Sequence, residues 1–217
     1  ADLQDSVRRL AIKSCIALAT TPSGSSNPEI RQAIIHCVQK LQSDVSWRIR
    51  WSVASSFTQL AKCIGMDTLR DPLLGMYCSL LEDAEDEVRA AAALQIKKMS
   101  VLLTTKEIVD QLLPRIDRLS DDENNHVRGA LATVIMSISP CIGKELTIQY
   151  LLPLFLKMLK DVNPDVQLNI ISCLEDVNKV VGVSRLAQSL HPVCMMRLLF
   201  VHLLGISLPV LTRLLAD

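Results

Sequence analysis

One short pattern recurs five times along the chain and decides what it can fold into. It begins with an aspartate and reaches valine or isoleucine five residues later. The aspartates are Asp2, Asp44, Asp83, Asp122 and Asp161, so the last three intervals are 39 residues each and the first is 42. The apolar anchors that follow them are Val7, Ile49, Val88, Val127 and Val166. A period of this length is typical of repeat proteins, in which every unit has the same secondary structure.

Each repeat is predicted to be a helical hairpin. Apolar residues keep a helical spacing after the anchors, as at Val127, Leu131 and Val134, so a second helix begins there. Another periodic apolar segment precedes each aspartate, at about 28–41, 67–81, 106–119 and 145–159. The predicted turns between the paired helices are 43–48, 83–87, 121–126 and 161–165. Three second helices are predicted to end at glycine, at Gly65, Gly143 and Gly182.

The composition favours a stack of such hairpins. Aliphatic side chains dominate the 49% hydrophobic content, aromatic residues make up 3%, and the 217 residues include only seven glycines. These values favour helices over a β-sandwich. One hairpin cannot bury both apolar faces alone, so neighbouring hairpins must complete its core. We therefore predict an all-α fold, an α-solenoid of about five stacked hairpins over residues 1–192.

The net charge and the cysteine spacing limit which partners and which cellular compartment are expected. Lys plus Arg and Asp plus Glu are 23 each, so no net charge attracts nucleic acid, and none is expected as a partner. The seven cysteines contain no C-x-x-C pair, which favours a reducing compartment, the cytoplasm or the nucleus. The opening residues have no signal-peptide pattern. The histidines lack metal-ligand spacing, so we expect no metal, no cofactor and no small-molecule substrate.

The charged residues of the repeated pattern are interpreted as structural. An arginine follows four of the five anchors, and Gln167 takes its place in the last copy. An aspartate before a helix and an arginine in its first turns can bond to loop amides and to neighbouring repeats. The residues of this predicted brace are Asp44, Arg50, Asp83, Arg89, Asp122, Arg128 and Asp161. Five equivalent copies without a nucleophile or an acid–base pair argue against an enzyme.

Trp47 raises a separate question, because it lies beside Arg48 in a predicted turn and outside the apolar stripe. Exposed Trp and Arg residues commonly anchor protein interfaces. Alternatively, the indole folds over the turn and packs on the next repeat. The residues alone leave both interpretations open.

Two prolines carry a family resemblance. Pro114 stands eight residues before Asp122 and thirteen before Val127, and Pro153 keeps the same offsets to Asp161 and Val166. This spacing resembles the HEAT-repeat family. Longer stretches, among them "SWRIRWSVASSFTQLAKCIG" and "HVRGALATVIMSISPCIGKELTIQYLLPLFLKMLKD", resemble the middle portion of the scaffold (A) regulatory subunits of protein phosphatase 2A, over about residues 5–192.

The resemblance implies a non-catalytic platform with two partners, the catalytic subunit of a serine/threonine phosphatase and a regulatory B-type subunit. It places partner contacts on a ridge of turns, here Ser46, Trp47, Arg48, Glu85, Asp86, Glu123 and Asn124. Ser46 and Trp47 match the turn that faces regulatory subunits in that family. The repeats that the resemblance assigns to the catalytic subunit lie beyond Pro192 and have no counterpart here. The alternative is a HEAT-type adaptor of a nuclear transport or chromatin complex.

The pattern is lost in a divergent apolar tail, residues 193–217. Pro192 predicts an Asp at 200 and a Val-Arg pair at 205 and 206, where the chain has Phe200, Gly205 and Ile206. The apolar stretch 198–211 is shorter than the roughly 20 residues of a membrane-spanning helix, so no membrane contact is expected. We interpret this loss of the repeated pattern as the result of an altered reading frame or of an unusual splice end. The tail is predicted to form an apolar helix that covers the last repeat.

Overall fold

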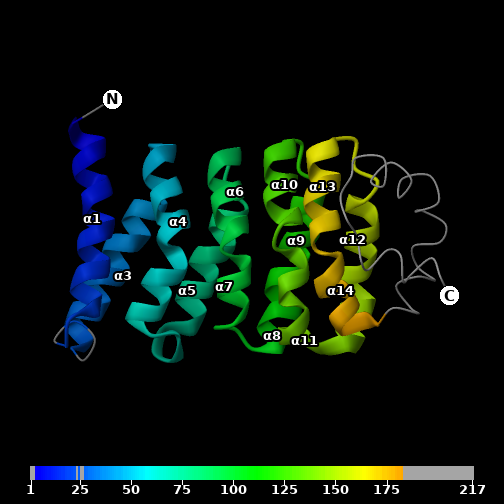
Figure 1. Ribbon diagram of the computed structural model, residues 1–217. Helices are drawn as coiled ribbons and strands as arrows, with labels where there is room; N and C mark the ends of the chain where they lie inside the picture. Colours follow the sequence, from blue (N-terminus) through cyan, green and yellow to red (C-terminus); the bar gives the residue numbers. More distant parts are fainter. Residues whose placement is uncertain (1–2, 23, 25–26, 183–217) are drawn as a thin grey trace. The chain divides into compact units, whose positions relative to one another are not determined.

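The computed structural model describes residues 3–22, 24 and 27–182 of the chain, and every regular element in these ranges is a helix (Figure 1). The prediction of an all-α fold built from helical hairpins is confirmed. The chain divides into two compact units, Ala1–Leu131 and Ala132–Asp217, and each is described by itself. The predicted tail at 193–217 and its boundary at 192 lie outside the described residues.

The first unit contains most of the hairpins. Its elements are α1 (Leu3–Thr20), α3 (Pro28–Gln42), α4 (Trp47–Ile64), α5 (Met66–Leu81), α6 (Asp86–Leu94), α7 (Ile96–Ser100), α8 (Thr105–Glu107), the π-helical segment η1 (Ile108–Leu112), α9 (Leu113–Ser120) and α10 (Asn125–Ala132), which ends at the boundary with the second unit. Helix α3 pairs with α4, and α5 pairs with α6. The second helices α1, α4 and α6 pack side by side (Figure 1).

The second unit continues the same plan. Its elements are the 3₁₀ segment η2 (Ile135–Ile138), α11 (Ser139–Leu146), the π-helical segment η3 (Thr147–Leu151), α12 (Leu152–Met158), α13 (Pro164–Ser172) and α14 (Leu174–Val181). Helix α12 packs against α13, and α14 packs against α11.

Four of the five predicted anchors lie in the core. The side chains of Ile49, Val88, Val127 and Val166 are 0% exposed. Val7 is 65% exposed, so its prediction as a core anchor is wrong. Each buried anchor follows the first helix of its own hairpin, whereas no helix precedes α1 within the described residues to cover Val7.

The second helices begin earlier than predicted. Helix α4 begins at Trp47, α6 at Asp86, α10 at Asn125 and α13 at Pro164, so each includes the last two residues of the range predicted for its turn. Trp47 and Arg48 therefore belong to the first turn of a helix, which corrects their assignment to the preceding turn. The early start follows from the aspartate side chains, which hold the amides just ahead of the helix, as described below.

Three second helices are broken where the apolar pattern predicts continuous ones: α6 at Gln95, α10 after Ala132 and α13 at Cys173. Helix α6 stops at Leu94, and the Gln95 amide donates to Ala92 O at 3.0 Å, a 3₁₀-type bond. The same carbonyl accepts the buried Tyr77 hydroxyl from α5 at 2.9 Å. At the third break, the Cys173 amide donates to Ile170 O at 3.1 Å. The Tyr77 hydroxyl that bonds to Ala92 O beside Gln95 comes from a neighbouring helix. The apolar spacing along α6 alone therefore does not reveal this break.

The predicted glycine stops and proline positions have clear backbone roles. Gly65, Gly143 and Gly182 have φ values of 89°, 81° and 90°, a region that side chains disfavour, and the helical path is interrupted at each. Pro114 and Pro153 each follow a π-helical segment. The wider π turn accommodates a proline ring that cannot donate a backbone hydrogen bond.

In the described residues, no single helix has the length and apolar character needed to cross a membrane. A bent pair, Asn125–Ala132 with Ile135–Met158, meets that criterion by length and composition alone.

Candidate functional site: the ladder of turns

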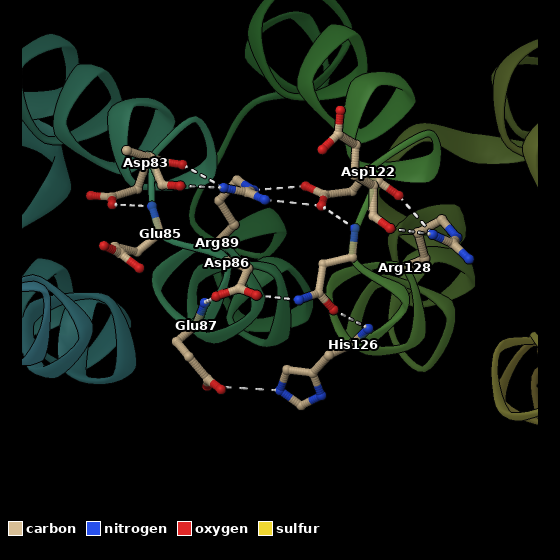
Figure 2. A network of polar contacts seen from close by, with 11 residues as sticks. Asp83, Glu85, Asp86, Glu87, Arg89, Asp122, His126 and Arg128 are labelled. Carbon is tan, nitrogen blue, oxygen red and sulfur yellow. Dashed lines mark hydrogen bonds and ion pairs between the residues drawn. The ribbon is translucent and has the colours of Figure 1, made fainter.

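The turns between paired helices carry most of the predicted site residues. Figure 2 shows two successive turns of the first unit, with Asp83 and Arg89 from one and Asp122 and Arg128 from the next. The geometry explains which of these side chains hold the turns together and which remain accessible.

Each of the four described aspartates of the pattern, Asp44, Asp83, Asp122 and Asp161, closes its own turn. One carboxylate oxygen accepts the amide two residues further on: Ser46 donates to Asp44 at 2.8 Å, and Glu85 donates to Asp83 at 2.9 Å. The turn that begins at Asp122 repeats this bond, from the Asn124 amide to Asp122 at 3.0 Å. Asp and Asn favour this local bond because their short side chains reach a backbone amide two residues away. The bond orders the residues immediately before each second helix.

The arginine after each anchor closes the same turn from the other side. Arg50 Nη1 donates to Asp44 O at 2.8 Å, and Arg89 Nη1 donates to Asp83 O at 2.8 Å. Arg128 Nη1 makes the equivalent bond to the Asp122 carbonyl at 2.7 Å. These bonds satisfy turn carbonyls that the helices leave without a partner.

Arg50 and Arg89 also bridge to the next repeat. Arg50 reaches Asp83 through two bonds, Nε to Oδ2 at 2.7 Å and Nη2 to Oδ1 at 2.8 Å. Arg89 makes the same two-point contact with Asp122, at 2.7 and 2.9 Å (Figure 2). Arg8 Nε lies 2.8 Å from Asp44 Oδ2. The result is a ladder in which Asp44, Asp83 and Asp122 each hold their own turn and accept an arginine from the preceding repeat.

The arginine and aspartate side chains of the ladder are partly shielded from water, which strengthens the attraction between their opposite charges. The Arg89 and Asp122 side chains are 19% and 8% exposed. The hydrogen bond with Asp122 raises the pKa of Arg89, and burial opposes that change with a smaller effect. Asp83 raises the pKa of Arg50 in the same way. Two-point bonds between guanidinium and carboxylate are among the stronger and more geometrically specific polar contacts in proteins.

Some residues predicted for partner contact engage one another instead. Asn124 Nδ2 donates to Asp86 Oδ2, and the Asn124 carbonyl oxygen accepts the His126 amide at 2.8 Å (Figure 2). Ser46 Oγ donates to Asp5 Oδ2 at 2.8 Å. Asn124 and Asp86 therefore link two successive turns, and Ser46 links its turn to helix α1.

The remaining predicted contact residues are accessible. Arg48, Glu85 and Glu123 are exposed, and Trp47 is half-buried as the first residue of α4. The Arg48 guanidinium carbon lies 4.7 Å from the centroid of the Trp47 ring, a cation–π arrangement. The two side chains therefore form one small surface.

Sequence reasoning missed the residue next to this surface. Val45 lies at the tip of the turn and is 96% exposed, and Val162 at the equivalent position of the second unit is 91% exposed. Both directly follow an aspartate of the repeated pattern, where the other two turns have Ala84 and Glu123. An apolar side chain immediately after that aspartate was the available signal. We call Val45, Trp47 and Arg48 the ridge patch.

The described residues offer little reactive chemistry. No group of three or more His, Cys, Asp or Glu side chains in the described ranges is placed to hold a metal ion. The six cysteines described are free thiols. Burial raises the pKa of Cys15 to about 12, with a smaller contribution from its hydrogen bond with Cys37. A thiol in that state is protonated at neutral pH and is a poor nucleophile.

Comparisons with known protein families agree with the observed hairpins. A model described as PPP2R1A-like HEAT repeat matches residues 67–143, and a general HEAT-repeat model matches residues 151–181. The regulatory A subunit of protein phosphatase PP2A from Schizosaccharomyces pombe is 44% identical over 70 residues. That alignment covers 32% of this chain and 12% of the yeast protein. The chain thus contains HEAT repeats, and it aligns with a small part of the yeast protein.

Solved structures with little sequence identity share the fold. The MAST/Orbit N-terminal domain superposes with a TM-score of 0.61 at 19% identity, over 88% of this chain and 84% of that one. A designed armadillo repeat protein, solved in complex with the peptide (KR)4, gives 0.53 at 22% identity, over 82% and 78%. Both similarities support the assignment of the fold as an α-solenoid of HEAT or armadillo type.

Proposed function

We propose that this chain is a non-catalytic scaffold resembling the A subunit of protein phosphatase 2A, and that it binds other subunits of a serine/threonine phosphatase. The alignment with the yeast A subunit carries this proposal. Its support is the PPP2R1A-like model, whose matched range, 67–143, includes the bridge from Arg89 to Asp122.

The partner of the ridge patch is, in this proposal, a regulatory B-type subunit. Val45 presents nearly its whole side chain, and Trp47 adds a large apolar surface with a cation beside it. Buried Trp and Arg residues contribute more to protein interfaces than most other types. The half-exposed indole would gain free energy by becoming buried in a complex. The catalytic subunit is proposed as a partner of the assembled complex, and cytoplasm and nucleus are the proposed locations.

The proposal is tested with immobilised B-type subunits and the full chain in solution. We expect saturable binding, and we expect Trp47→Ala to weaken the affinity at least about tenfold, because an interface anchor contributes about 2 kcal/mol or more. Lys106→Ala is the matched control, since Lys106 is also exposed but lies on α8. Thermal unfolding of both variants should follow that of the parent chain closely.

Two results would reject the proposal. Failure of the parent chain to bind any B-type subunit would remove the phosphatase partner. Unchanged affinity of Trp47→Ala together with a clear loss of thermal stability would show that the indole packs between repeats.

A further inference from the structure

A groove lies between the second helices α1 and α4, in the first unit. It encloses a cavity of about 470 Å³ whose walls come from these two helices alone. Arg9, Leu10 and Lys13 contribute from α1, and Trp51, Ser55 and Ser56 contribute from α4. None of them belongs to the ladder or to the ridge patch, so neither feature accounts for the groove.

The groove has an accessible apolar part. Leu10 is 57% exposed and Trp51 is 38% exposed, and the cavity lies between their two helices. An apolar side chain that entered the cavity would be removed from water together with parts of both residues. Burial of this kind contributes roughly 25 cal/mol per Å² of apolar surface, so one leucine-sized side chain would contribute about 1.5–3 kcal/mol to the binding free energy.

The groove also has a basic part. Arg9 and Lys13 are exposed and lie four residues apart on α1, so they are neighbours on its surface. Among the described residues, neither side chain has a hydrogen bond or an ion pair, and no acidic residue lines the cavity. Two cations at this spacing repel each other. A carboxylate placed between them would interact favourably with both and relieve that repulsion.

The hydroxyl groups of the α4 wall favour a peptide as the occupant. Ser55 Oγ donates to Trp51 O at 2.9 Å, and Ser52 Oγ donates to Arg48 O at 2.9 Å. Because each hydroxyl uses its proton within the helix, its oxygen remains an acceptor for a backbone N–H group. A nucleic acid fits less well, because two cations release few counterions.

We propose that the groove between α1 and α4 binds a short peptide segment of a partner protein, with an apolar side chain in the cavity and a carboxylate between Arg9 and Lys13. The peptide backbone passes along the serine wall of α4. The site is independent of the ridge patch and does not require a phosphatase partner.

The test uses the full chain and fluorescein-labelled pools of ten-residue peptides. Each pool fixes one leucine or phenylalanine and two adjacent glutamates, separated by one to four residues, with Ser, Gly or Ala elsewhere. Matched pools carry lysine in place of glutamate. Binding is measured by fluorescence anisotropy. The chain has two tryptophans, so a Trp47→Phe background leaves Trp51 as the only indole and reports whether a bound peptide reaches it.

We expect at least one glutamate pool to bind saturably and to change the Trp51 emission. The double charge reversal R9E/K13E should weaken that binding at least tenfold. The control K40E/K106E changes the net charge equally at two exposed lysines of α3 and α8, and it should alter the affinity less than twofold. Trp51→Ala should also weaken binding, whereas the ridge variant Trp47→Ala should not.

Four outcomes would overturn the proposal. The first is absence of saturable binding by every glutamate pool. The second is equal binding of the lysine pools, which would indicate apolar adhesion without charge recognition. The third is an equal loss in R9E/K13E and K40E/K106E, which would indicate a general charge effect. A single-stranded oligonucleotide that binds more tightly than the peptides would also overturn it.

Discussion

The turns that begin at Asp83 and at Asp161 belong to the third and fifth copies of the repeated pattern and are called the third and fifth turns here. Both start with an aspartate, and they differ in the residue after the anchor. In the third turn, Arg89 donates to the Asp83 carbonyl and also reaches Asp122 of the next repeat through two bonds. In the fifth turn, the Gln167 side chain donates to the Asp161 carbonyl, which is the one side-chain hydrogen bond that Gln167 makes with the described residues. Both turns keep the aspartate bond to the amide two residues on.

This difference separates two roles that one arginine performs. Closing the turn needs one N–H donor at the right distance, and a neutral amide provides it. Bridging to the next repeat needs a longer, charged side chain with two parallel donors. The repeated arginine is therefore required for contact between repeats more than for the shape of its own turn.

The largest effect is expected from removing both roles together. Arg89→Ala leaves the Asp122 carboxylate, 8% exposed, without its arginine, and should lower the free energy of unfolding by about 2–3 kcal/mol. Arg118→Ala is the matched control, because Arg118 pairs with Glu82 at 2.6 Å but is 73% exposed. We expect a loss within about 0.5 kcal/mol for the control. Urea denaturation followed by circular dichroism measures both, and equal losses would contradict the bridging role.

An intermediate effect is expected when only the bridge is removed. Arg89→Gln reproduces the fifth turn in the third, since a glutamine there can still donate to the Asp83 carbonyl. The free energy of unfolding should fall by about 1–2 kcal/mol, less than for Arg89→Ala. The same urea titration measures it. A loss as large as that of Arg89→Ala would show that the two roles are inseparable.

The smallest effect is expected from pH. The hydrogen bond with Asp122 raises the folded-state pKa of Arg89 above the usual value for arginine, so the contribution of Arg89 is fully present below that usual pKa and is lost only as the pH rises through the folded-state pKa. The stability difference between the parent chain and Arg89→Ala should therefore be the same at pH 7 and pH 10. A difference that shrinks over this range would mean that another titrating group controls the bridge.

Much of the fold could be predicted because the repeated pattern marks equivalent positions in every hairpin. The turn positions, the buried anchors at Ile49, Val88, Val127 and Val166, and the glycine stops all depend on residues close together in sequence. The contacts of the aspartates with loop amides and neighbouring repeats also followed from the pattern. Contacts between residues that are close in sequence, when they recur at a fixed period, can be predicted from a single sequence.

The features that were missed depend on distant residues. The break at Gln95 involves the Tyr77 hydroxyl of another helix, and the exposure of Val7 depends on the absence of a covering helix among the described residues. Val45 was overlooked because an isolated valine in a short turn has no periodic partner that would mark it as exposed. The groove at Trp51 appears only when α1 and α4 are placed side by side.

The central claim is that one turn separates stability from binding: its charged residues brace the repeats, and its exposed residues contact a partner. The most direct measurement compares Arg50→Ala with Val45→Asp, two variants of the same turn, for melting temperature and for affinity toward a B-type subunit.

We predict that Arg50→Ala lowers the melting temperature by several degrees, because a loss of about 2 kcal/mol is expected for its bridge to Asp83. Below its melting temperature, this variant should bind with nearly unchanged affinity. Val45→Asp should keep the melting temperature and weaken binding at least about tenfold. The reverse pattern, a stable Arg50→Ala that fails to bind and a destabilised Val45→Asp that binds normally, would contradict the account.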